Sequence, residues 1–93
     1  MNKVKLTKAR KKIDLIDKGI FNLIKKRTQI VKHMLSLKKS RSQIIDRKRI
    51  NVILNNIKKK SIKHKVDTKI TLPIWKRMIW SYIEYQKNNF KKK

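Results

Sequence analysis

The sequence contains no cysteine, one glycine and one proline in 93 residues. Without cysteine, the chain can form neither a disulfide framework nor a thiolate metal site. The scarcity of glycine and proline leaves few tight turns, which disfavours sheet-rich folds and favours one small helical domain. The basic N-terminus is not followed by a long apolar run. The sequence therefore predicts neither a signal peptide nor a membrane span, and we expect a cytoplasmic protein.

Acidic residues are also scarce, with five Asp and Glu against 29 Lys and Arg, which gives a net charge of +24 at pH 7. Such a charge first suggests a nucleic-acid partner. However, Lys, Ile and Asn together supply 45 of the 93 residues, a bias typical of an AT-rich genome, and the cations are spread along the whole chain. We interpret most of the charge as solvated surface. A basic helical module that binds nucleic acid or another partner is the alternative.

The apolar residues that are present, 39% of the chain, first follow a helical period. A three-and-four spacing predicts one amphipathic helix over residues 6–38, with its apolar stripe at Ile13, Ile16, Ile20 and Leu23, then at Ile30 and Met34. Gly19 lies inside it at a cost of about 1 kcal/mol. Such a helix would be about 50 Å long, whereas a compact globule of this size is about 32 Å across. Its apolar stripe therefore needs an external cover, and a second copy of the chain is the simplest one.

A second, shorter helix follows a connection at residues 39–45. Asp46 is a suitable N-cap, and apolar residues recur on one face after it. The pattern fades in the Lys58–Lys60 run, whose cations suit a helix C-terminus. Residues 61–66 are predicted to form a polar loop.

A third helix, of medium length, is expected to begin between Asp67 and Pro73, with Pro73 in its first turn. Its apolar stripe reaches Phe90. The predicted fold class is all-α, with three helices per chain (long, short and medium) in a single domain of residues 1–93. We expect the basic ends, residues 1–5 and 91–93, to fray.

Three polar residues stand where the helical pattern calls for apolar ones: Arg27, Lys38 and Gln86. Buried cations and amides are costly unless they are paired, and the chain offers few carboxylates. Together these residues predict a site for an external anion. Each one alone also has a simpler explanation: Arg27 reaching solvent, Lys38 at a helix end, or Gln86 as a satisfied interior amide. The sequence has no Gly-rich loop, and His33 and His64 stand alone, so no metal or cofactor is predicted.

Four segments resemble the all-helical chorismate mutases and their relative, isochorismate-pyruvate lyase. They are ARKKIDLIDKGIFNLIKKR at residues 9–27, Lys38, DRKR at 46–49 and IWKRMIWSYIEYQ at 74–86. The resemblance runs from about Arg10 to Phe90. It implies an intertwined helical homodimer with two active sites, each lined by both chains.

Roles can be carried over to the matching positions. Arg10 resembles the arginine that reaches into the partner's site, and Arg27 the arginine that clamps a substrate carboxylate. Lys38 resembles the residue that contacts a carboxylate and the ether oxygen of the substrate. Gln86 resembles the amide that donates a hydrogen bond to that ether oxygen.

Asp46 and Arg49 resemble the start of the second helix, which lines the pocket. Tyr82 is a further pocket position. Ile50 stands where many mutases carry a glutamate, and Tyr82 where several carry a serine. The lyase has an apolar residue and a tyrosine at these places, so a lyase of the same fold remains the second interpretation.

The resemblance implies an isomerase that rearranges chorismate to prephenate in phenylalanine and tyrosine biosynthesis, without a cofactor. The step is pericyclic and needs neither a nucleophile nor an obligatory proton transfer. The enzyme has to fold the substrate over its ring and stabilise negative charge on the ether oxygen. Arginine suits the planar, bidentate binding of the two carboxylates.

Overall fold

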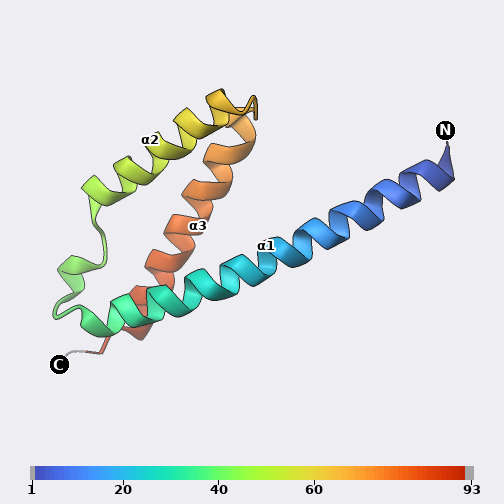
Figure 1. The fold of residues 1–93 in the computed structure, drawn as a ribbon. Coiled ribbons are helices and arrows are strands. Elements are labelled where there is room, and N and C mark those ends of the chain that lie inside the picture. The colour runs from blue at the N-terminus through green and yellow to red at the C-terminus, as the bar shows by residue number, and fades with distance from the viewer. Residues whose placement is uncertain (1, 92–93) are drawn as a thin grey trace. The chain divides into compact units, whose positions relative to one another are not determined.

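The computed structural model describes residues 2–91 and is all-α, with no strand in this range (Figure 1). The elements are α1 (Lys3–Leu37), the short 3₁₀ helix η1 (Arg41–Gln43), α2 (Arg47–Lys63) and α3 (Thr68–Asn89). This confirms the predicted all-α class and the order of long, short and medium helices. The chain separates into two units, Met1–Lys32 and His33–Lys93, and each is described by itself. Of the ends predicted to fray, residues 1, 92 and 93 lie outside the described range.

The first unit consists of the N-terminal part of α1. Among its described residues none is buried. The predicted stripe is exposed by 49–65% at Ile13, Ile16, Ile20 and Leu23. Isolated helices gain little stability from their own hydrogen bonds, and most helical stability in proteins comes from packing of the apolar face. This stretch of α1 therefore carries an apolar surface that requires a cover.

The second unit is built on α2 and α3, which pack against each other as a helical hairpin (Figure 1). Its core is a small cluster of four buried side chains: Leu35, Ile44, Ile79 and Ile83. Two of them come from α3, one from the end of α1 and one from the turn before α2. Partly buried side chains surround this cluster, among them Ile45, Ile50, Ile53, Leu54, Tyr85 and Phe90. The core thereby fixes the end of α1 and the following turn against α3.

The start of α2 is as predicted, but its end is not. The Asp46 side chain caps the helix by accepting a hydrogen bond from the Arg49 backbone N–H over 3.0 Å. The helix continues to Lys63, so the predicted end at Lys58–Lys60 and the predicted loop from residue 61 are wrong. Ser61 is only 4% exposed, and its hydroxyl bonds to the Ile57 carbonyl and the Thr71 hydroxyl, each at 2.7 Å. These bonds allow a polar side chain to be buried between the helices.

A short turn joins α2 to α3. The Val66 N–H donates to the Ser61 carbonyl and the Lys65 N–H to the Ile62 carbonyl, which is the Schellman pattern of a helix end. Lys65 adopts a left-handed backbone with φ of 56°, a conformation that favours glycine. Asp67 then caps α3 by accepting from the Lys69 N–H over 2.8 Å.

Pro73 lies inside α3, in its second turn, and not in the first turn as predicted. At this position it removes one backbone hydrogen bond near the start of the helix. The packed stripe of α3 nevertheless follows the predicted spacing, with Ile79, Ile83 and Gln86 all buried. Within residues 2–91, no helix combines the length and the apolar character that crossing a membrane requires.

Candidate active site

A lysine and a glutamine from distant parts of the second unit form the centre of the site. Lys38 directly follows α1, and Gln86 lies near the end of α3. The Lys38 Nζ donates to the Gln86 Oε1 over 2.7 Å. Gln86 is only 6% exposed, and Lys38 is half-buried. The structure thus brings together two of the three polar residues that interrupt the predicted apolar stripes.

The Gln86 amide is oriented by two contacts that agree. The Lys38 ammonium can only donate, so it faces the amide oxygen. The amide nitrogen donates to the Tyr82 carbonyl oxygen one turn earlier, over 3.2 Å. Nε2 carries two hydrogens and only one is used in this bond. The second N–H of the amide can therefore donate to a ligand.

Two opposing effects act on the pKa of Lys38. Burial lowers the pKa of Lys38 from its usual 10.5 because it disfavours the charged form, while the nearby Asp46 carboxylate raises the pKa. The lowering effect is the larger of the two. An anionic ligand beside Lys38 would add a further opposite charge and favour the cation.

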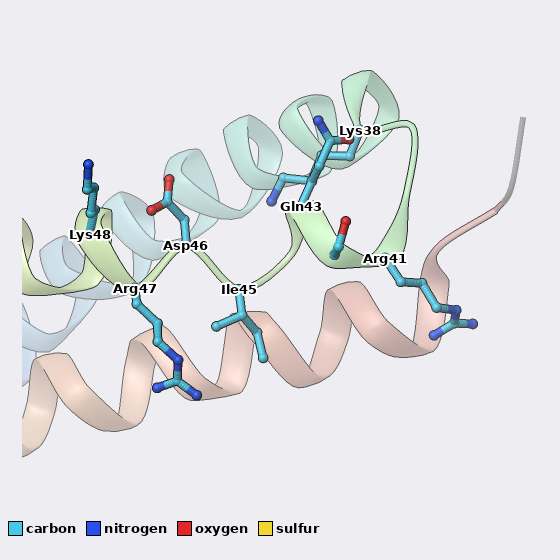
Figure 2. A pocket seen from close by; sticks show the side chains of 8 residues that line it. Lys38, Arg41, Gln43, Ile45, Asp46, Arg47 and Lys48 are labelled. Atoms are coloured by element: carbon cyan, nitrogen blue, oxygen red, sulfur yellow. The ribbon is translucent and has the colours of Figure 1, made fainter.

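A pocket opens beside this pair, between the end of α1 and the start of α2 (Figure 2). It is lined by Lys38, Arg41, Ser42, Gln43, Ile45, Asp46, Arg47 and Lys48. Four of these eight residues are cations and one is a carboxylate, so the pocket favours a small anion. In Figure 2, Asp46 extends to one side of the connecting segment, whereas Arg41 extends to the other, along α3.

Two predicted site residues complete the picture in this unit. Tyr82 lies one turn before Gln86 and is half-buried. Arg49 is exposed in the first turn of α2, where its backbone bonds to Asp46, and it is not one of the residues that line this pocket.

The two remaining predicted arginines belong to the first unit. Arg10 is exposed and Arg27 is half-buried, and both lie on α1. Arg27 stands on the same helical stripe as Leu23 and Val31, as the sequence pattern predicted.

Sequence reasoning missed most of the pocket lining. Arg41, Gln43 and Arg47 lie in or next to the segment treated as a plain connection. The Gln43 Oε1 accepts from the backbone N–H of Lys39 and of Ser40, at 2.6 and 3.3 Å. No periodicity exists in so short a segment, so its only signal is the run of polar side chains directly after Lys38.

The described residues offer no metal site. Within residues 2–91, no three His, Cys, Asp or Glu side chains gather as ligands. In the same range, each buried side-chain nitrogen and oxygen has a hydrogen-bond partner. The chemistry available to the pair is thus hydrogen-bond donation and positive charge.

The fold and the site define a small all-helical protein whose cation–amide pair suits a compact anionic ligand. The sequence model of the chorismate mutase type II family matches residues 9–87, most of the chain. The chain therefore belongs to this all-helical family, and the membership supports a function of the chorismate mutase type, an isomerase. Among curated proteins and solved structures, none matches the chain.

Proposed function

We propose that the protein is a chorismate mutase that converts chorismate to prephenate, in the cytoplasm and for phenylalanine and tyrosine biosynthesis. The observation that carries the proposal is the Lys38–Gln86 pair, at 2.7 Å, in a chain of the chorismate mutase type II family. The pair offers several N–H donors in a partly desolvated place. This set suits a reaction in which a developing negative charge has to be stabilised and no proton transfer is obligatory.

In the proposed step, one carbon–oxygen bond of the enolpyruvyl ether breaks while a carbon–carbon bond forms within the same molecule. Negative charge grows on the ether oxygen in the transition state. Lys38 retains two N–H donors besides the one used by Gln86, and the Gln86 amide retains one. Donors that are already oriented need no reorganisation during the reaction. No cofactor takes part in this scheme.

The other predicted residues would bind the two substrate carboxylates and shape the pocket. Arg27 would clamp one carboxylate through its planar guanidinium, and Arg10 would reach the site of the partner subunit. Asp46 would line the pocket at the start of α2. Arg49 and Tyr82, which lie outside the pocket lining, would contact the substrate from α2 and from α3. The exposed position of Arg10 on α1 is compatible with a role across a subunit interface.

The exposed apolar stripe of α1 supports a homodimer with shared active sites. Ile13, Ile16, Ile20 and Leu23 are all exposed, and each such side chain gains about 1.5–3 kcal/mol when fully buried. Sedimentation should therefore give about twice the chain mass of 11.3 kDa at micromolar concentration. A stable, folded monomer would contradict the dimer.

A second candidate, isochorismate-pyruvate lyase activity, is favoured by one observation. Ile50 is half-buried and packs against the core of the second unit. Because its side chain is a hydrocarbon, it cannot hydrogen-bond a substrate hydroxyl as a glutamate would. The purified protein should be incubated with chorismate and, separately, with isochorismate. Faster formation of prephenate supports the mutase, an excess of pyruvate supports the lyase, and no turnover of either substrate rejects both.

A further inference from the structure

Arg41, the first residue of η1, ties the turn after α1 to the C-terminal end of α3. Its Nη1 donates to the Lys87 carbonyl oxygen over 3.0 Å, and its Cζ lies 5.6 Å from the centroid of the Phe90 ring. The last carbonyls of a helix lack partners within the helix, and a cation there also interacts favourably with the helix dipole. The guanidinium therefore holds α3 at the residue that directly follows Gln86.

Two contacts thus join the same two segments. Lys38 bonds to the Gln86 side chain and Arg41 bonds to the Lys87 backbone, so both arms reach from one turn to one end of α3. In Figure 2, Arg41 extends from the connecting segment along α3. Lys38 contacts Gln86 in the candidate active site, whereas Arg41, which also lines the pocket, binds the backbone of the helix that carries Gln86.

The turn between the two arms is braced from inside. The Gln43 amide oxygen accepts from the backbone N–H of Lys39 and of Ser40. The Ile44 N–H donates to the Arg41 carbonyl over 3.1 Å, and the Ile44 side chain is buried in the core. A braced turn transmits the anchoring of Arg41 to Lys38. A flexible turn would let the long lysine side chain sample other rotamers.

We propose that Arg41 is a positioning residue, which clamps the turn to α3 and thereby holds the Lys38 Nζ against the Gln86 Oε1. The catalytic consequence rests on the proposed function, because it assumes that this pair acts on chorismate. The clamp itself concerns only the second unit and can be observed without substrate.

The first readout is kcat in the full-length protein. Arg41→Met removes the donor but keeps an apolar stem beside Phe90, and it should lower kcat about tenfold with a smaller change in KM, because misplaced donors affect the transition state most. Arg41→Lys keeps a charge and a donor and should recover most of the loss. Arg77→Met is the matched control, because Arg77 is an exposed arginine on α3, the helix that Arg41 contacts. It should leave kcat unchanged.

A double-mutant cycle separates positioning from a general loss of structure. If Arg41 acts through Lys38, Arg41→Met should cause no further loss of kcat in a Lys38→Met background. An equal loss in both backgrounds would overturn the proposal.

The second readout is the NMR signal of the Gln86 side-chain amide, recorded without substrate. It should shift in Arg41→Met and stay in place in Arg77→Met, and an unchanged signal in Arg41→Met would overturn the clamp. If Arg41→Met does not fold, as judged by its helical circular dichroism, Arg41→Leu, which also lacks a donor, replaces it in both readouts with the same expected directions. If the wild type converts no chorismate, the proposed function fails, and the amide signal still decides about the clamp.

Discussion

Replacing Gln86 by glutamate changes one group at the centre of the proposed site. The side chain keeps its length, and an oxygen can still accept from Lys38, which lies 2.7 Å from Oε1 in the native protein. The amide nitrogen becomes a second carboxylate oxygen, and it faces the Tyr82 carbonyl, whose oxygen is 3.2 Å from Nε2. An ionised carboxylate only accepts hydrogen bonds, so Gln86→Glu removes a donor and brings two acceptors together.

The expected loss follows from the role of the lost donor. Removing one preorganised donor to a developing oxyanion lowers kcat by about 10²–10³. A negative charge beside the ether oxygen adds repulsion, so at neutral pH we expect Gln86→Glu to lose at least about 10³-fold in kcat. Protonation of the new carboxyl restores an O–H donor. However, the adjacent Lys38 cation holds the pKa of this carboxyl down, so activity should recover only partly as the pH falls to about 5.

The assay is the pH profile of kcat for prephenate formation, from about pH 5 to 9. Gln86→Met is the matched control, because it removes donor and acceptor without adding a charge. It should lose activity without the partial recovery at low pH. Full activity of Gln86→Glu at about pH 8 would show that Gln86 does not donate to the ether oxygen. Gln86 would then be only an interior amide with satisfied hydrogen bonds.

Three further predictions concern Lys38, the end of α2 and the surface charge. The kcat/KM for chorismate, which reports on the free enzyme, should fall as the pH rises through the pKa of Lys38, which lies below the usual 10.5 because the side chain is partly buried. Lys38→Arg should move this alkaline limb of kcat/KM upward, and a wild-type limb at or above 10.5 would contradict the assignment. Lys65→Gly should raise the free energy of unfolding by about 1 kcal/mol in urea denaturation, because Lys65 has φ of 56°, whereas Lys63→Gly within α2 should lower it by a similar amount. Changing Lys58–Lys60 to glutamine should leave kcat nearly unchanged, because these lysines are exposed near the end of α2; a loss of tight, salt-sensitive DNA binding in this variant would instead favour the nucleic-acid interpretation.

The succession of long, short and medium helices along the chain could be predicted because it depends on apolar periodicity and on helix caps. The stripes of α1 and α3 follow the three-and-four spacing, and Asp46 and Asp67 cap the helices they precede. The predicted end of the second helix before Ser61 was wrong. A serine usually favours solvent or a helix end, whereas Ser61 is buried inside α2. Its burial depends on a hydroxyl partner, Thr71, from the next helix, and no local pattern reveals such a partner.

The candidate site was accessible to sequence reasoning in part. Lys38 and Gln86 interrupt apolar stripes, and this interruption predicted both as site residues. In the structure, the Lys38 Nζ lies 2.7 Å from the Gln86 Oε1. Arg41 and Gln43 lie in a short turn, which has no periodic apolar pattern that a polar residue could interrupt. Their roles arise from contacts to Lys87 and to the backbone of the turn itself, which only the folded chain defines.

The proposed chorismate mutase activity depends on the Lys38–Gln86 pair. Its most direct test is the rate at which the purified protein consumes chorismate and forms prephenate, compared with the rate of its Lys38→Met variant. We expect steady turnover by the wild type and a loss of about 10²–10³ in kcat for Lys38→Met. This substitution nearly keeps the size of the side chain but removes its charge and its donors. Equal rates for the two proteins, or no prephenate from the wild type, would contradict the proposal.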